Sequence, residues 1–413
     1  MTLDQIDLTD LDFFVNGDIY EAFRLLRTQA PVHWQERVPG RGFWSVTRYH
    51  DVLACYRDPQ ALSSAMGVTL FFGAPEPDRA GMGRMMIMTD PPRHPKVRQL
   101  LSRRFTPRAI APYEGRIRAI VDEIIDSVIE RGECDFVVDV AAKLPTATIC
   151  EMMGIDRRHW DLMFAIANQT VGRHDNEYAM GRSGRETFID AQVRAAAFML
   201  EEANRRRKNP TDDLISALVG GSVMGEAISE PDIVANCFLL ILGGQETTRN
   251  ASSGAMLALI QNPDERAKFL SNPAAAEATE EFLRWTSPVT HIMRTATRDL
   301  EIEGRKIRAG QRVVLWNASA NRDERQFPNP DRFDVTRTPN DHVAFGHGEH
   351  FCLGANLARL QMRIMLKQVA RRLPDIELAG PAERLRSNFV AGIKHMPVRF
   401  APRHAQTRLL EAN

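Results

Sequence analysis

Cys352 stands at the start of a helical pattern, in surroundings that suit a thiolate. It belongs to the loop 345–354, Phe-Gly-His-Gly-Glu-His-Phe-Cys-Leu-Gly, and apolar spacing typical of a helix follows from Leu353. Unpaired backbone N–H groups and the positive end of the helix dipole favour an anion at such a position. Gly348 lets backbone approach closely, and Phe345 can shield the sulfur. We therefore expect a metal-ligating thiolate at Cys352; the alternative is an ordinary buried apolar cysteine.

A second unusual feature is a pair of adjacent glycines in the middle of the longest helical pattern. Gly243 and Gly244 precede Gln245, Glu246 and Thr247. Each glycine costs a helix about 1 kcal/mol relative to alanine, so the pair indicates a place where space or a distorted turn is needed. A tight crossing of two helices is the alternative explanation.

Two pairs of charged residues have helical spacing. Glu281 and Arg284 lie three residues apart, and His94 and Arg98 four apart, so the members of each pair share a helix face. On an exposed surface the first pair contributes only about 0.2 to 0.5 kcal/mol. Taken alone, both pairs are typical of solvated helix faces.

Apolar spacing predicts a mainly helical chain with a minor β part. The clearest helical patterns are Ile110 to Glu130, Glu186 to Arg206, Glu230 to Ile260, Ala274 to Trp285 and Leu353 to Leu373. The short extended stretches are Gly42 to Thr47, Leu300 to Ile307, Gln311 to Leu315 and His395 to Phe400. Residues 323–341 follow neither period and predict an irregular surface segment. We expect one domain over residues 1–413, with residues 1–17 and 402–413 loosely attached.

Composition and charge exclude several classes of protein. The 53 basic and 53 acidic residues cancel, so no overall field would attract nucleic acid or an anionic membrane. The apolar fraction of 44% is ordinary for a globular chain, and no apolar run approaches the roughly 20 residues that cross a bilayer. Residues 1–14 are acidic, unlike a signal peptide. The five cysteines are too widely spaced to suggest a disulfide framework. We expect a cytoplasmic protein with no nucleic-acid partner and no membrane anchor.

The loop 345–354 resembles the haem-binding signature of the cytochrome P450 family, Phe-x-x-Gly-x-His-x-Cys-x-Gly, and fits it at every specified position. The family's cysteine is the axial thiolate of the haem iron, which the resemblance assigns to Cys352. Phe345, Gly348 and His350 take cofactor-binding positions of the same loop. With motifs in the family's order from about residue 18 to 401, the resemblance implies a single large helical fold with small β-sheets and haem b buried between two long helices.

Other segments match further motifs of the family. Glu246 and Thr247 take the positions of an acid and an alcohol that relay protons to bound dioxygen, and the preceding Gly243 stands where the family often has alanine. His94, Arg98 and Arg294 match residues that bind the haem propionates, for which charge-assisted partners are physically reasonable.

The resemblance also implies a structural network. Glu281 and Arg284 fit the family's Glu-x-x-Arg motif, which forms a buried network with an arginine farther along the chain, and Arg332 matches that arginine.

These matches together imply a haem-thiolate monooxygenase that inserts one oxygen atom of O2 into a C–H bond. The implied substrate is an apolar small molecule such as a steroid, terpenoid, fatty chain or secondary metabolite. Met86, Gly243, Val289 and Ile292 are expected to line its pocket, with Phe71, Phe72 and Met82 in a Met-rich and Phe-rich segment beside it.

Electrons are expected from an external ferredoxin and its reductase, because the chain carries no fused flavin or iron–sulfur region. A basic face near Cys352 could receive the ferredoxin, and its candidate residues are Arg98, Arg103, Arg104 and Arg108.

Three alternatives stay open at this stage. The substrate could be an amino acid or polyketide intermediate bound to a carrier protein. His347, His350 and Cys352 could instead ligate zinc or non-haem iron, although that hypothesis leaves Glu281, Arg284 and Thr247 unexplained. A haem-based gas or ligand sensor is the non-enzymatic alternative.

Overall fold

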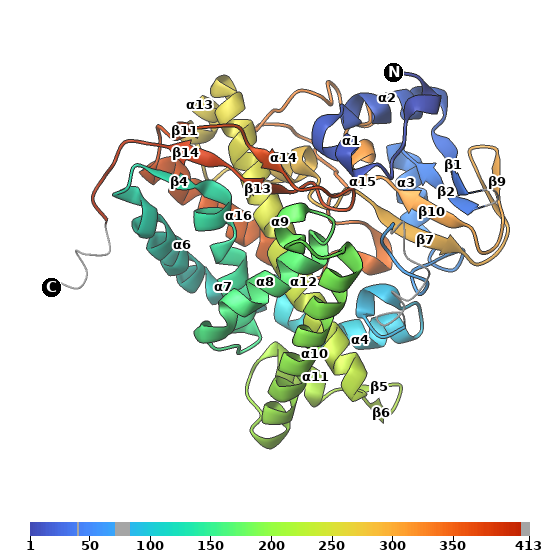
Figure 1. Ribbon diagram of the computed structural model, residues 1–413, viewed down its shortest axis with the longest axis horizontal. Coiled ribbons are helices and arrows are strands. Elements are labelled where there is room, and N and C mark those ends of the chain that lie inside the picture. The colour runs from blue at the N-terminus through green and yellow to red at the C-terminus, as the bar shows by residue number, and fades with distance from the viewer. Residues whose placement is uncertain (39–40, 71–82, 406–413) are drawn as a thin grey trace.

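Helices dominate the structure, a computed structural model that describes residues 1–38, 41–70 and 83–405 (Figure 1). The helices are α1 (Leu11–Asn16), α2 (Ile19–Gln29), α3 (Tyr49–Arg57), α4 (Arg93–Ser102), α5 (Pro107–Ile110), α6 (Tyr113–Ile129), α7 (Lys143–Met152), α8 (Trp160–Val171), α9 (Asn176–Ala179), α10 (Gly184–Lys208), α11 (Leu214–Val219), α12 (Glu230–Gln261), α13 (Pro263–Ser271), α14 (Ala276–Thr286), α15 (Asn317–Ala320) and α16 (Ala355–Arg372). The mainly α fold class is confirmed.

The strands are short and form small sheets. They are β1 (Val32–Val38), β2 (Arg41–Val46), β3 (Leu62–Ser63), β4 (Glu133–Asp135), β5 (Ser222–Val223), β6 (Glu226–Ala227), β7 (Ile292–Ala296), β8 (Leu300–Ile302), β9 (Arg305–Ile307), β10 (Arg312–Leu315), β11 (Glu377–Leu378), β12 (Glu383–Arg384), β13 (Ile393–His395) and β14 (Pro397–Arg399). The largest sheet has the order β1-β2-β10-β7-β3 and is antiparallel except for the parallel pair β2 and β10. It carries Ile292 and Arg294 on β7.

Helix α12 runs through the middle of the molecule, with the largest sheet on one side and α6, α7 and α16 on the other (Figure 1). Its start is well specified, because the Ser229 side chain accepts a hydrogen bond from the N–H of Asp232 and a proline stands in the first turn. Helices α7, α8, α10, α14 and α16 all contact it. A central helix packed on several sides must be apolar nearly all round, which makes its few polar residues conspicuous.

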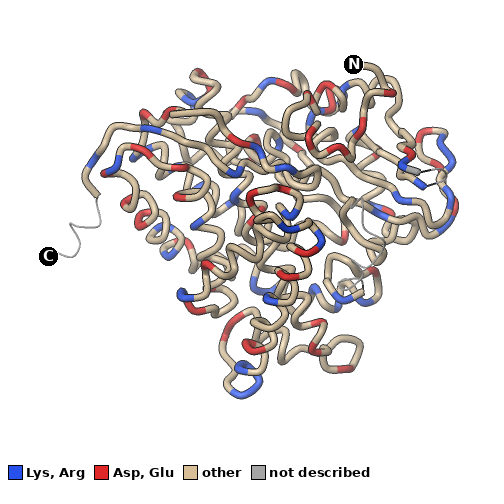
Figure 2. Tube along the Cα trace, in the orientation of Figure 1, with Lys and Arg blue, Asp and Glu red and all other residues tan. Residues whose placement is uncertain are grey.

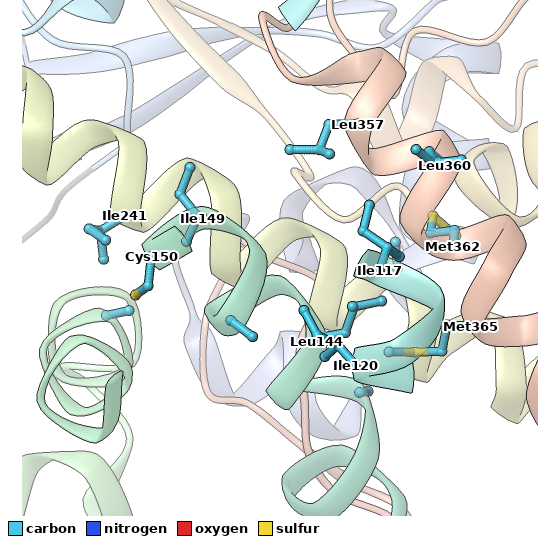
Figure 3. Close-up of a cluster of buried hydrophobic side chains, with 14 of the residues drawn as sticks. Ile117, Ile120, Leu144, Ile149, Cys150, Ile241, Leu357, Leu360, Met362 and Met365 are labelled. Carbon is cyan, nitrogen blue, oxygen red and sulfur yellow. The ribbon is translucent and has the colours of Figure 1, made fainter. Parts of the chain in front are cut away.

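Apolar side chains from α6, α7, α12 and α16 meet in the main core. Ile117, Leu144, Ile241 and Met365 show how the four helices interlock (Figure 3). Cys150 lies among them, fully buried, as an ordinary apolar cysteine. This core holds α12 and α16 side by side.

The two ends of the chain differ from what we expected of them. Residues 1–17 are not loosely attached: Leu8 is completely buried, and its carbonyl accepts a hydrogen bond from Asn388. Asp12 forms an ion pair with Arg386. Among residues 402–405, Arg403 pairs with Asp375, so this part is tethered too, and residues 406–413 lie outside the described part. The expectation was wrong because it rested on the acidic residues of the N-terminal segment and overlooked Leu8, the apolar residue that attaches it.

Basic and acidic residues are interspersed along the whole trace (Figure 2). Of the residues that the structure describes, none belongs to a helix long and apolar enough to cross a membrane.

Candidate active site

A cavity of about 950 Å³ lies against the middle of α12 and the start of α16. Cys352 lines it, just before α16, and its backbone N–H donates to the carbonyl of Phe345 at 2.9 Å. This bond closes the loop into a turn that brings the Phe345 ring to the same cavity. Because Cys352 is the only cysteine among the lining residues that the structure describes, it is set apart from Cys150.

The loop around Cys352 packs its backbone at Gly348 directly against the backbone of Tyr56. Gly348 has φ of +70°, and a Cβ added there would lie 2.6 Å from the backbone oxygen of Tyr56, so no side chain is tolerated. Gly348 itself does not line the cavity; it lets the loop pack against α3. The guanidinium of Arg359 lies 4.7 Å from the centre of the Phe345 ring. The loop is therefore held on both sides.

Burial raises the pKa of the Cys352 thiol, while a hydrogen bond from the backbone N–H of Gly354 and the charges of Arg98 and Arg359 act to lower it. We expected the start of the helix to favour the thiolate. The N–H and the two arginines do lower the pKa of the thiol, but burial raises it by more, so the net pKa lies above the usual value. A bound metal cation would supply the missing charge, since a coordinating thiol loses its proton.

Four nitrogen-bearing side chains line one end of the cavity: His94 and Arg98 from α4, Arg294 from β7 and His350 from the loop before Cys352. The rings of His94 and His350 are 4.0 Å apart. Burial lowers the pKa of His94 to about 4 and that of His350 to about 2, with neighbouring arginines adding to the effect. At neutral pH both imidazoles are uncharged, and each can donate one N–H.

The two arginines at this end are poorly satisfied within the protein. Arg294 is 4% exposed, yet it donates only to the neighbouring Met293 carbonyl and stacks near the Tyr56 ring. Arg98 donates to the Phe351 carbonyl at 2.7 Å. No acidic side chain among the described residues forms an ion pair with Arg98 or Arg294. A buried guanidinium such as that of Arg294, with the half-buried one of Arg98 beside it, calls for an anion.

These observations fit the haem implied by the sequence resemblance. The Nδ1 atom of His94 is buried without a hydrogen-bond partner in the described structure, next to the two under-satisfied arginines. A macrocycle with two carboxylates and a metal that takes a thiolate ligand would satisfy His94, Arg98, Arg294 and Cys352 together.

Helix α12 passes along the cavity at the glycine pair. A Cβ on Gly243 would meet nothing within 4 Å, whereas one on Gly244 would lie 2.9 Å from Ile149 Cγ1 on α7. The two explanations of the pair therefore apply to different residues: Gly244 permits a tight helix crossing and Gly243 leaves open space at the cavity. The helix itself runs without interruption from Glu230 to Gln261.

Glu246 and Thr247 both line the cavity. The Thr247 hydroxyl donates to the Gly243 carbonyl at 2.8 Å, which leaves the oxygen's lone pairs available. Glu246 is 2% exposed; its Oε2 lies 2.5 Å from Nη2 of Arg249, and its Oε1 has no partner among the described residues. Burial raises the pKa of Glu246, and the charge of Arg249 acts in the opposite direction.

Beneath the Cys352 loop, Glu281 and Arg284 form a completely buried ion pair with two contacts of 2.7 Å. Arg284 also donates to the carbonyls of Asn321 and Pro330, at 2.8 and 2.9 Å. Glu281 accepts from the N–H of Asp334 at 2.9 Å. The pair therefore fastens α14 to the irregular segment that leads to the loop.

The arginine of this network is Arg337, so the prediction of Arg332 is wrong. Nε of Arg337 lies 3.2 Å from Glu281 Oε2, with its side chain 8% exposed. The Arg332 side chain is 62% exposed and lies 3.8 Å from Glu265. Its carbonyl nevertheless accepts hydrogen bonds from Arg284 and Arg337. In an irregular segment no period indicates which arginine points inward.

The predicted substrate-lining residues Met86, Gly243, Val289 and Ile292 all line the cavity. Phe71, Phe72 and Met82 lie outside the described residues. Sequence reasoning missed the N-terminal contribution to the wall, which comes from Thr9 and Leu11, whereas the C-terminal turn expected from Asn388 lines the cavity through Asn388, Phe389 and Val390. It also missed Arg249, whose position three residues after Glu246 was an available signal.

The alternative zinc site does not form. His347 Nε2 accepts a hydrogen bond from Arg57, whereas His350 Nε2 lies 3.1 Å from the Ser64 hydroxyl. Across the described ranges, no three His, Cys, Asp or Glu side chains are grouped to hold a metal ion.

The comparisons with known proteins agree with this geometry. The family model described as Cytochrome P450 matches residues 145–272 and 273–374. The steroid C26-monooxygenase of Mycolicibacterium smegmatis is 38% identical over 97% of this chain and 98% of the relative. The methyl-branched lipid omega-hydroxylase of Mycobacterium bovis is 38% identical over 96% of this chain and 95% of its own. The structure of Mycobacterium marinum cytochrome P450 CYP268A2 in complex with pseudoionone has a TM-score of 0.90 at 36% identity, covering 96% of this chain and 99% of the other.

Proposed function

The chain belongs to the cytochrome P450 family and is a monooxygenase, and we propose that it hydroxylates an apolar small molecule with haem b held by Cys352. The single observation that carries this proposal is the shared cavity. Cys352 on one wall and Thr247 on another line the same space, although 105 positions separate them in the sequence. A haem bound there supplies dioxygen activation and the redox chemistry of C–H oxidation.

The chain's own residues position the cofactor. Cys352 would ligate the iron, and the Gly348 turn fixes the direction of the sulfur. Arg98, Arg294 and a ring N–H of His94 would hold the two carboxylates, which removes the cost of leaving buried guanidinium groups unpaired. His350 would add a further N–H at the same end.

Glu246 and Thr247 would deliver the protons that are consumed when dioxygen is cleaved. Both residues line the cavity, Oε1 of Glu246 is buried with no hydrogen-bond partner among the described residues, and the Thr247 hydroxyl can accept and donate a hydrogen bond in sequence. The burial that raises the pKa of Glu246 brings it closer to the operating pH, where a proton donor works best.

The substrate we propose is apolar, because Phe238, Leu239, Val289, Ile292 and Phe389 line the cavity. Steroids and branched lipids, the substrates named for the two relatives, are the first compounds to screen. A steroid-sized molecule suits a site that buries most of its ligand against hydrophobic side chains.

Electrons would come from a ferredoxin and its reductase. Of the four arginines considered for docking, Arg98 faces the cavity and Arg104 pairs with Asp212, which leaves the exposed Arg103 and Arg108 as the candidates. Replacing both by glutamate should raise the KM for ferredoxin, with no change in the Kd of substrate measured by absorption titration.

The absorption spectrum of the reduced, carbon monoxide-treated protein tests the proposal. A strongly red-shifted Soret band is expected for the wild type and for Cys150→Ser, the matched control in the apolar core. Cys352→Ser should lose this band, because a serine alkoxide is inaccessible at neutral pH. If Cys352→Ser keeps the band, the ligand lies elsewhere; a wild-type protein that takes up no haem would refute the proposal.

A further inference from the structure

Arg249 is a large, fully buried cation that the active-site motif does not include. It lies one turn after Glu246 on α12 and is 2% exposed. Its Nη2 contacts Glu246 Oε2 at 2.5 Å, and its Nη1 donates to the side-chain oxygen of Asn168 on α8. The guanidinium is therefore held between the acid and the neighbouring helix.

This arrangement gives the two carboxyl oxygens of Glu246 different surroundings. Oε2 accepts a hydrogen bond from the guanidinium, whereas Oε1 is buried and has no partner in the part of the chain that the structure describes. Without Arg249 the carboxyl could rotate, because the torsion next to a carboxyl group is broad and roughly two-fold. With Arg249 in place, Oε2 is fixed and Oε1 is the carboxyl oxygen left without a partner among the described residues, on a side chain that lines the cavity.

Asn168 sets the direction of the guanidinium. It is 6% exposed, and it lies two residues before the cavity-lining Thr170. The Nε of Arg249 also approaches the Asn250 side-chain oxygen at 3.5 Å. A planar guanidinium anchored from α8 keeps a defined orientation, which an ammonium group on a flexible chain would not.

We propose that Arg249, braced by Asn168, is a positioning residue that fixes Glu246 so that Oε1 is the oxygen that holds the transferable proton. This inference rests on the proposed role of Glu246 in proton supply. Arg249 touches neither the substrate nor the cofactor in this scheme, since it acts only through the acid.

Electrostatics supports the same role. An isolated carboxyl in this position would be neutral over a wide pH range, because burial raises its pKa. The Arg249 charge lowers the pKa, and an opposite charge this close is typically worth about 1 to 3 pH units. On α9, Tyr178 is the titratable group that also faces this pair, and burial raises its pKa well above the working range, so it stays neutral. Asn168 on α8 and Asn250 carry no charge.

The test is an infrared titration of the Glu246 carboxyl in the haem-loaded protein, with the band of the protonated acid assigned by its loss in Glu246→Gln. Arg249→Met should shift the titration midpoint upward by about 1 to 3 pH units. Arg249→Lys, which keeps a charge, should shift it less. Asn168→Leu should broaden or split the band, because the guanidinium loses its anchor.

Arg194→Met is the matched control. Arg194 lies on α10, pairs with Asp190 and donates to Gln169, the α8 neighbour of Asn168, so its loss perturbs the same helix contact without touching Glu246. Its titration midpoint should equal that of the wild type. If Arg249→Met leaves the midpoint unchanged, Arg249 is merely structural and the inference is wrong. Circular dichroism and haem content verify that each variant is folded.

The pH dependence of coupling, measured as product formed per NADH consumed, gives the second readout. Arg249→Met should shift its profile upward in parallel with the infrared midpoint, whereas a purely structural role would lower the yield at every pH alike. The infrared result does not depend on turnover. A midpoint that shifts in Arg249→Met, in a protein without monooxygenase activity, would therefore refute the proposed function alone. Full wild-type activity with an unchanged midpoint in Arg249→Met would refute the positioning role of Arg249 alone.

Discussion

The two sides of the active-site cavity are built by different physical means. On the cysteine side, a completely buried ion pair, Glu281 with Arg284, is tied by hydrogen bonds to several backbone carbonyls and N–H groups. The rest of the wall includes apolar side chains such as Val289 and Ile292, and on α12 a Cβ at Gly243 would meet nothing within 4 Å. Directional bonds hold the cysteine side, whereas apolar packing prevails on the other side, around the buried ion pair of Glu246 with Arg249.

This difference has a functional consequence. A metal-ligating sulfur must keep its position to a fraction of an ångström, which hydrogen bonds and ion pairs achieve. An apolar wall tolerates exchange of one hydrophobic side chain for another of similar volume. The comparison therefore implies that mutations on the cysteine side act on folding and cofactor retention, whereas mutations of Thr247 and Gly243 on α12 act on turnover and substrate choice.

The largest effect is expected from Arg284→Met. Removing the guanidinium takes the bidentate partner from the buried Glu281 and leaves it with the single contact of Arg337, and breaking a buried pair in this way costs about 3 to 5 kcal/mol. We expect loss of haem retention and a sharply lower midpoint of urea unfolding, measured by circular dichroism.

Two other arginines act as graded controls for that variant. Arg337→Gln should destabilise less than Arg284→Met, because Arg337 makes only one of the contacts to Glu281. Arg332→Gln should have nearly wild-type stability, since its side chain is largely exposed and only its backbone joins the network. Equal destabilisation by Arg332→Gln and Arg337→Gln would contradict the assignment.

Thr247→Ala is expected to have the next largest effect, on turnover instead of stability. Loss of the hydroxyl should reduce coupled product formation by about 100-fold, equivalent to about 2.7 kcal/mol, with the reducing equivalents recovered as hydrogen peroxide. The carbon monoxide spectrum and the unfolding midpoint should not change. Thr247→Ser, which keeps the hydroxyl, should recover most of the coupling; fully coupled Thr247→Ala would remove the proton role.

Local signals in the sequence predict much of the frame. Helix α10, predicted from Glu186 to Arg206, begins at Gly184 behind a capping box of Ser183 and Glu186. Helix α12 agrees within a residue or two for the same reason. Short-range hydrogen bonds and apolar periods act over a few residues, so they can be recognised without tertiary structure.

Side-chain direction in irregular segments could not be predicted in this way. Arg332 and Arg337 belong to the same segment, and the choice between them depends on tertiary structure: only the folded chain brings Arg337 to within 3.2 Å of Glu281 on α14. The burial of Leu8 likewise depends on a partner, Asn388, 380 residues away. Contacts of this kind are tertiary and leave no periodic signal.

The glycine pair on α12 allows a sharper comparison within one turn. Gly244→Ala places a methyl 2.9 Å from Ile149 Cγ1, so α7 or α12 must shift. Overpacking of this kind typically costs about 1 to 3 kcal/mol, more than the helix gains from replacing glycine. A lower midpoint of urea unfolding is expected, and part of the loss should be recovered when Gly244→Ala is made in an Ile149→Ala background, which lacks Cγ1. No recovery would mean that the strain lies elsewhere.

Gly243→Ala should have the smallest and opposite effect on stability. Its Cβ meets nothing within 4 Å, so the substitution should raise the free energy of unfolding by up to about 1 kcal/mol through helix propensity alone. The same methyl enters the cavity wall beside Thr247, where it takes volume from the substrate. Absorption titrations should therefore show weaker binding of a bulky ligand such as a steroid and unchanged binding of a slender one. A stabilised variant that binds both as the wild type does would show that Gly243 opens onto space that the substrate does not use.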